Sequence, residues 1–64
     1  MKASELRDLT DDELEQRLID SRQELFNLRF QAATGALENT ARVAAAKQDV
    51  ARILTVQRER QETR

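Results

Sequence analysis

Apolar residues in the first half of the chain recur along two separate lines of a helix. The first line advances in steps of four and three residues and forms a seam with one polar member: Leu14, Leu18, Ser21, Leu25, Leu28 and Ala32. The second line, here called the aromatic stripe, lies roughly 100–160° further round and consists of Ile19, Phe26, Phe30 and Ala33. One line is sufficient to pack against a neighbouring helix of the same chain. The stripe therefore requires another explanation.

The first helix has a complete set of start and stop signals. Thr10 is suited to the N-cap position, and Glu13 three residues later completes a capping box. Leu9 and Leu14 have the spacing of a hydrophobic staple across the cap. Gly35 ends the pattern, because glycine adopts the left-handed cap conformation without steric cost. These signals predict a helix over residues 11–34.

Two further segments follow from the same analysis. Residues 1–9 are expected to form a lead-in of about one helical turn, with Leu6 and Leu9 as its apolar contacts. A connector over residues 35–39 leads to a second helix over residues 40–61, capped by either Asn39 or Thr40. The seam of this helix has Leu54 beside it and comprises Val43, Ala46, Val50, Ile53 and Gln57.

These elements predict an all-α fold in which two long helices form an antiparallel helical hairpin with a short N-terminal lead-in. The 64 residues are expected to form a single small domain over residues 1–64. The absence of proline and the single glycine favour long uninterrupted helices. A hairpin of two helices leaves its second apolar line exposed to water, so we expect the protein to function on a larger body.

Composition argues against several classes of function. The chain has no histidine, cysteine or tyrosine, so the usual general bases and nucleophiles are missing and no enzyme is expected. No metal, cofactor or small-molecule substrate is expected either, because the acidic run at residues 11–15 suits a helix start and lacks the spacing of a calcium loop. The longest apolar run covers only residues 43–46, which excludes a membrane span and favours a soluble, intracellular protein.

Charge is distributed unevenly although the net charge is only −1. Residues 1–40 carry five basic and nine acidic side chains, and residues 41–64 carry six basic and three acidic ones. The asymmetry matches the helix dipoles, and it also suits a basic second half that faces an anionic partner; both explanations stay open. Phosphate contacts by Arg42, Lys47 and Arg52 would position the rod on a nucleic acid, for which folded RNA is better suited than DNA.

The aromatic stripe likewise has more than one interpretation. It can be extra core that the lead-in or the helix ends cover, a docking face for another protein, or an apolar edge packed on nucleic acid. Ile19, Phe26 and Phe30 are the candidate protein contacts. A free-standing coiled-coil interaction module or adaptor, self-associating through these three side chains without binding RNA, is the alternative function.

Two blocks of sequence resemble a known family. Residues 24–31 read Glu-Leu-Phe-Asn-Leu-Arg-Phe-Gln, followed by Ala-Thr-Gly at residues 33–35 and Leu-Glu-Asn at residues 37–39. Residues 47–53 read Lys-Gln-Asp-Val-Ala-Arg-Ile, with further matches at residues 55–56 and 58–60 and in the lead-in at residues 6–10 and 12–14. In combination they resemble the bacterial large ribosomal subunit protein twenty-nine family over nearly the whole chain.

This resemblance implies a two-helix hairpin in the cytoplasm, on the large subunit of the ribosome, with a role in translation. It implies binding to large-subunit ribosomal RNA near the exit of the peptide tunnel, beside the neighbouring large-subunit ribosomal protein twenty-three, where chaperone and targeting factors dock. Carried over by matching position, the candidate RNA contacts are Asn27, Arg29, Gln31, Arg42, Lys47 and Arg52. The family is usually strongly basic, and this chain departs from it in that respect.

Overall fold

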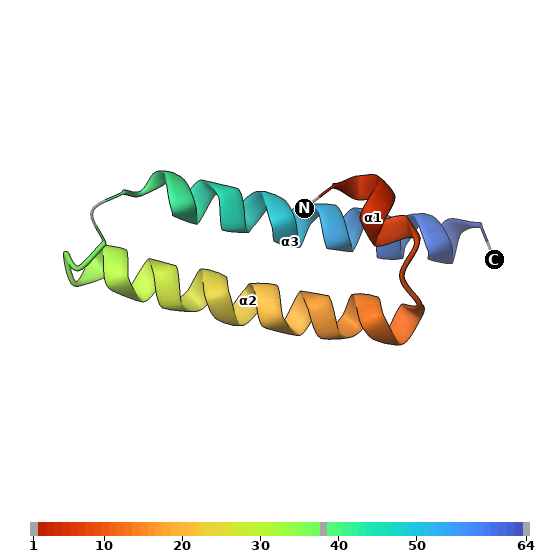
Figure 1. Ribbon diagram of the computed structural model, residues 1–64, viewed down its shortest axis with the longest axis horizontal. Helices are drawn as coiled ribbons and strands as arrows, with labels where there is room; N and C mark the ends of the chain where they lie inside the picture. The colour runs from red at the N-terminus through yellow and green to blue at the C-terminus, as the bar shows by residue number, and fades with distance from the viewer. Residues whose placement is uncertain (1, 38, 64) are drawn as a thin grey trace.

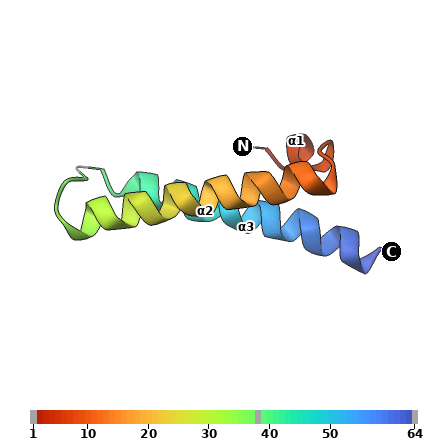
Figure 2. The same cartoon turned by 90° about the horizontal axis from the view of Figure 1, so that it is seen from below.

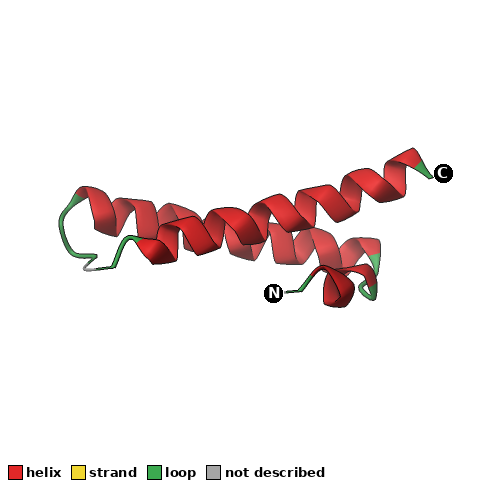
Figure 3. Cartoon of the chain, turned by 90° about the horizontal axis from the view of Figure 1, so that it is seen from above, coloured by secondary structure: helices red, strands yellow, loops and turns green. Residues whose placement is uncertain are grey.

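The protein is a slender antiparallel helical hairpin with a short third helix at one end. A computed structural model describes residues 2–37 and 39–63, so Glu38 of the predicted connector lies outside the described residues. In chain order the helices are α1 (Ala3–Arg7), α2 (Asp11–Ala33) and α3 (Ala41–Glu62). The two long helices run side by side in opposite directions within a rod of 44 × 17 × 17 Å (Figure 1). The described residues contain helices and loops but no strand (Figure 3), which confirms the predicted all-α hairpin.

Helix α2 begins with one half of the predicted capping box, the bond accepted by Thr10, without a return bond from the Glu13 side chain, and it ends at the predicted glycine. Thr10 has extended backbone angles, and its Oγ1 accepts a hydrogen bond from the backbone N–H of Glu13 at 3.2 Å. At the other end Gly35 has a φ of +79°, and the N–H of Ala36 donates to the carbonyl of Gln31 at 2.9 Å. The left-handed glycine turns the chain back over the last helical turn, so α2 ends at Ala33.

The structure distinguishes the two candidate caps of α3. The Oδ1 atom of Asn39 accepts a hydrogen bond from the backbone N–H of Ala41 at 2.9 Å, whereas the side chain of Thr40 makes no capping bond. Asn39 is therefore the capping side chain, although Thr40 occupies the N-cap position. The helix continues to Glu62, and the Thr63 hydroxyl donates to the carbonyl of Glu59 at 3.0 Å.

The predicted seams meet between α2 and α3. On α2 the side chains of Leu14, Leu18, Ser21 and Leu28 are buried, and Leu25 and Ala32 are partly buried. On α3 Ala46 and Ile53 are buried, while Val43, Val50 and Gln57 are partly buried. The three-and-four spacing therefore identified the inward sides of both long helices correctly.

Helix α1 packs against α3 and thickens the rod near the chain ends (Figure 2). Its Leu6 side chain is fully buried and joins Leu14, Leu18, Ile53 and Val56 in the main hydrophobic cluster, with Leu9 packed against it. The apolar contacts expected of Leu6 and Leu9 are thus confirmed. Val56 is almost fully buried although it lies outside the predicted α3 seam, because α1 covers a second side of α3 at this level.

Polar contacts hold the N-terminal segment in place. Arg7 donates from Nε and Nη2 to the two carboxylate oxygens of Glu59, at 3.4 and 3.3 Å. Arg60 contacts the Asp11 carboxylate at 2.8 Å and donates to the backbone carbonyls of Arg7 and Leu9. Arg60 therefore bridges α3 to both the loop before α2 and the first turn of α2.

Candidate functional site

The aromatic stripe lies on the surface of α2. Phe26 is 69% exposed, Phe30 63% and Ile19 44%, and Ala33 is exposed as well. Helix α1 packs on α3 and leaves these side chains uncovered within the described part of the chain. The interpretation of the stripe as extra core beneath the lead-in is therefore wrong. Two exposed phenyl rings and an isoleucine on so small a chain indicate a contact surface.

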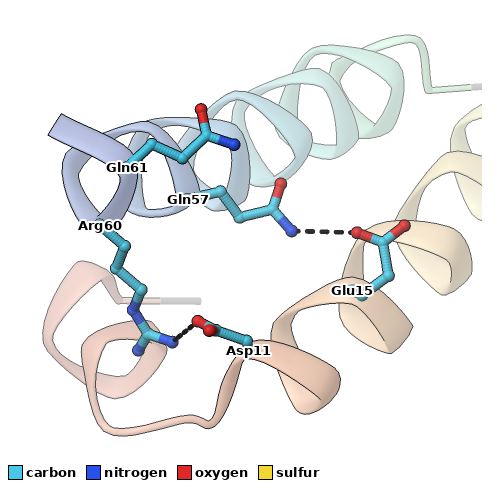
Figure 4. Close-up of a pocket in the computed structure, with 5 residues that line it drawn as sticks. All are labelled: Asp11, Glu15, Gln57, Arg60 and Gln61. Carbon is cyan, nitrogen blue, oxygen red and sulfur yellow. Dashed lines mark hydrogen bonds and ion pairs between the residues drawn. The ribbon is translucent and has the colours of Figure 1, made fainter. Parts of the chain in front are cut away.

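Two cross-helix contacts establish which residues of α2 and α3 lie at the same level (Figure 4). Asp11 contacts Arg60 at 2.8 Å, and Gln57 Nε2 donates to the Glu15 carboxylate at 3.2 Å. Both helices rise by the same 1.5 Å per residue, so equal numbers of residues are counted from the Glu15–Gln57 contact in opposite directions. Ile19 is then level with Ile53, one residue from Leu54, which is 40% exposed. Phe26 is level with Ala46, one residue from Lys47.

The same contacts show which sides of the two helices share one surface. Glu15 of α2 and Gln61 of α3 line one hollow, so the sides of the helices that carry them belong to one surface (Figure 4). A step of seven residues keeps a side chain on nearly the same side of a helix. Arg22 and Arg29 follow Glu15 at this step, and the members of the stripe lie next to them. Leu54 and Lys47 precede Gln61 at the same step. We call this surface the open face: Glu15, Ile19, Arg22, Phe26, Arg29, Phe30, Lys47, Leu54 and Gln61.

The open face combines apolar and basic side chains. Within residues 2–37 and 39–63, Arg22, Arg29 and Lys47 make no ion pair, and all three are exposed. A shallow hollow at its edge is lined by Arg22, Gln23, Phe26 and Asn27. Sequence analysis did not identify Leu54 and Lys47 as residues near the level of the stripe. The seven-residue step from Gln61 to Leu54 to Lys47 was the available signal, but it becomes useful only when the level of the two helices is known.

The structure spreads the candidate RNA contacts over several sides of the rod. Arg29 and Lys47 share the open face, whereas Asn27 and Gln31 are exposed toward the outer side of α2. Arg42 is exposed in the first turn of α3, near the connector. Arg52 lies on the side of α3 that α1 approaches, where it lines a hollow with Ala3 and Arg7.

Intramolecular contacts occupy part of the basic second half. Arg60 is held by Asp11, Arg58 by Glu62 at 3.1 Å, and Arg52 lies 3.8 Å from Asp49. Arg42 and Lys47 form no ion pair with any residue that the structure describes. Part of the positive charge in the second half of the sequence is therefore used within the fold, since Arg60 contacts Asp11 and the N-terminal segment.

Other kinds of site find no support in the described chain. No group of three or more acidic, histidine or cysteine side chains there is arranged to hold a metal ion. Among the described helices, none combines the length and apolar character needed to cross a bilayer. The open face is consequently the principal candidate for function.

Comparison with known proteins identifies the family. A family model described as ribosomal L29 protein matches residues 4–60, which include nearly all of the three helices. The chain belongs to the ribosomal L29 protein family. The resemblance carried by the two sequence blocks is thereby confirmed, and membership in this family makes the chain a structural protein of the ribosome rather than an enzyme.

Similar proteins come from several bacterial groups, and each is named large ribosomal subunit protein uL29. The protein of Maridesulfovibrio salexigens is 59% identical over 61 residues, covering 95% of this chain and 95% of its own length. That of Saccharopolyspora erythraea is 59% identical, over 92% of this chain and 74% of its own length. That of Staphylococcus aureus is 56% identical, over 95% of this chain and 88% of its own length.

Proposed function

We propose that this chain is a structural constituent of the large ribosomal subunit that binds large-subunit ribosomal RNA near the exit of the peptide tunnel. Family membership carries the proposal, because the relatives that match along nearly all of this chain are named for the large ribosomal subunit. On this proposal the protein acts on the ribosome in the cytoplasm and supports translation through assembly and structure, without a chemical step of its own.

RNA contact draws on exposed polar side chains of both long helices. Arg29, Arg42, Lys47 and Arg52 offer positive charge to phosphates, and Asn27 and Gln31 offer amides to the sugar–phosphate backbone. Contacts of this kind recognise the shape and backbone of a folded RNA rather than its sequence. Since the net charge of the chain is −1, attraction over long distances is weak. Binding therefore relies on local contacts and on the burial of apolar side chains.

Protein contact is assigned to the aromatic stripe. Ile19, Phe26 and Phe30 present apolar surface that the hairpin leaves exposed to water. Burial of such surface against a neighbouring subunit is favourable by about 1.5–3 kcal/mol for each large side chain. The proposed neighbour is the large-subunit ribosomal protein twenty-three, and chaperone or targeting factors at the tunnel exit are further partners.

Sedimentation of cell extract tests the main proposal. The tagged chain is expected to travel with the large subunit through a sucrose gradient and to stay with it when the subunits are separated at low magnesium. A tagged chain that remains at the top of the gradient contradicts the proposal. In that case the free-standing adaptor becomes the better description.

A salt titration with isolated large-subunit RNA tests the RNA contact itself. If four basic side chains each neutralise a phosphate, the logarithm of the binding constant falls by about three for each tenfold rise in salt. The quadruple variant with Arg29, Arg42, Lys47 and Arg52 replaced by Gln is expected to lose most of this dependence. Equal salt dependence for both proteins would show that these four residues do not contact phosphate.

A further inference from the structure

A shallow hollow on α2 gathers polar and basic side chains around one phenyl ring. It is lined by Arg22, Gln23, Phe26 and Asn27. Arg22 and Gln23 precede Phe26 by four and three residues, the spacings at which side chains on a helix are neighbours. Phe26 is 69% exposed, and the other three side chains are exposed as well. The hollow is therefore open to a binding partner.

The surroundings of the phenyl ring are basic. The residues three or four positions from Phe26 include two arginines and no acid: Arg22, Gln23, Arg29 and Phe30. At the same spacings Arg22 has only apolar neighbours, namely Leu18, Ile19, Leu25 and Phe26. Neither Arg22 nor Arg29 forms an ion pair with a residue that the structure describes. The local charge favours an anionic occupant.

The groups that line the hollow match the parts of a nucleotide. An exposed phenyl ring stacks on a base, whichever base is present. The guanidinium of Arg22 suits a phosphate, and the amides of Gln23 and Asn27 offer donors and acceptors to the edge of the base. A base inside a duplex has its faces stacked and its pairing edge occupied, so only an unpaired base uses all of these groups.

A protein surface is a poorer occupant of this hollow. It can cover the ring, but it must also supply an acid for Arg22 and hydrogen-bonding groups for two amides, because polar groups buried without partners are costly. Ile19 and Phe30 do not line the hollow. These two members of the aromatic stripe stay available for protein contact when Phe26 is used for RNA.

We infer that Phe26 stacks on one unpaired base of the large-subunit RNA. Arg22 then contacts the phosphate of that nucleotide, and the amides of Gln23 and Asn27 bind the edge of the base. This inference deepens the proposed function and rests on it. It adds Arg22 and Gln23 to the candidate RNA contacts and gives Phe26 a role distinct from that of the rest of the stripe.

Binding of the full-length chain to isolated large-subunit RNA, titrated with salt, tests the two parts of the site. Phe26→Leu keeps an apolar side chain but removes the ring, so it is expected to weaken binding about tenfold with an unchanged salt dependence. Arg22→Gln is expected to weaken binding and to reduce the slope of log K against log salt by roughly 0.7–0.9, the contribution of one phosphate. Binding by Phe26→Leu equal to that of the wild type overturns the inference.

Arg17→Gln is the matched control for Arg22→Gln. Arg17 is also an exposed arginine of α2, but it lies roughly 140° away around the helix and does not line the hollow. This variant is expected to bind RNA with the affinity and salt dependence of the wild type. A loss equal to that of Arg22→Gln shows a general effect of charge and overturns the assignment of Arg22.

Tryptophan fluorescence tests the stacking directly, because the chain contains no tryptophan of its own. Phe26→Trp is expected to retain RNA binding and to lose much of its emission when the RNA is added, since a stacked base quenches an indole. Phe30→Trp makes the same change one turn further along α2, outside the hollow, and is expected to be quenched much less. Equal quenching at both positions overturns the assignment to the hollow.

The outcomes separate this inference from the proposed function. A wild-type chain that binds no large-subunit RNA contradicts the proposed function as a whole. A wild-type chain that binds the RNA while Phe26→Trp stays unquenched contradicts the inference alone. Emission of Phe26→Trp that moves to shorter wavelength in assembled large subunits, without quenching by RNA, indicates burial of the ring against protein and likewise overturns the inference.

Discussion

Arg60 and Asp11 close the open end of the hairpin through an Nη1–Oδ1 contact of 2.8 Å (Figure 4). The Nη2 nitrogen of Arg60 donates to the backbone carbonyls of Arg7 and Leu9, just before α2 begins. One arginine near the C-terminus of α3 thus fixes the path of the N-terminal segment. The guanidinium of Arg60 is used for contacts within the protein, and a count of charges along the sequence does not reveal this role.

Loss of Arg60 is expected to destabilise the protein. Arg60→Ala leaves the Asp11 carboxylate and two carbonyls without this donor and is expected to lower the free energy of unfolding by about 1–2 kcal/mol. Urea denaturation followed by circular dichroism measures the change. Arg58→Ala is the matched control, because the ion pair of Arg58 with Glu62 is largely exposed and is expected to contribute at most about 0.5 kcal/mol. Equal effects of the two substitutions would show that the Arg60 contacts are not structural.

Leu6 is expected to hold α1 on the rod. Leu6→Ala removes a fully buried side chain from the main cluster and is expected to cost about 2–4 kcal/mol. Amide hydrogen exchange is expected to accelerate at residues 3–7 and on the part of α3 around Val56. Leu54→Ala, at a 40% exposed position, is expected to cost less than about 1 kcal/mol and to leave exchange in α1 unchanged. A larger loss of stability from Leu54→Ala than from Leu6→Ala would contradict the packing of α1 on α3.

The two candidate caps of α3 are expected to differ in their contribution. Asn39→Ala removes the acceptor for the Ala41 N–H and is expected to lower the free energy of unfolding by about 1 kcal/mol. Thr40→Ala is expected to change it by less than about 0.5 kcal/mol, because the Thr40 side chain makes no capping bond. Thermal denaturation of both variants at equal chain concentration makes the comparison. A larger loss from Thr40→Ala would contradict the observed cap.

Phe30 is expected to matter for assembly more than for folding. Because this ring is 63% exposed, Phe30→Ala is expected to change the free energy of unfolding by less than about 1 kcal/mol. In competition with the wild type, its incorporation into large subunits is expected to fall severalfold. Leu28→Ala, at a buried position two residues away, is expected to show the opposite pattern with a loss of stability of about 2–4 kcal/mol. Equal losses of stability for the two variants would place Phe30 in the core.

Local patterns were sufficient to predict much of the architecture. The cap at Thr10, the glycine at the end of α2 and the two seams depend on residues within a few positions of one another, so the sequence alone identifies them. The exposure of the aromatic stripe was left open by the sequence. A second apolar line on a helix looks the same whether the lead-in covers it or not.

The candidate RNA contacts were predicted from the family resemblance by matching position, and they stay predictions. What the structure adds is their distribution: Arg29 and Lys47 share one face, while Arg52 lies on the side that α1 approaches. A list of exposed basic residues cannot supply this distribution. It depends on the level and the rotation of one helix relative to the other.

Helical spacing and capping act over a few residues, so the sequence alone was sufficient to predict two long helices, their approximate ends, and the sides that they turn toward each other. The tertiary structure was needed to show that α1 covers Val56 and leaves the aromatic stripe uncovered, and that Arg60 holds the N-terminal segment. It was also needed to show that Leu54 and Lys47 lie within one residue of the levels of Ile19 and Phe26 along the rod. These relationships join residues from distant parts of the chain, and their geometry is established only when the helices pack.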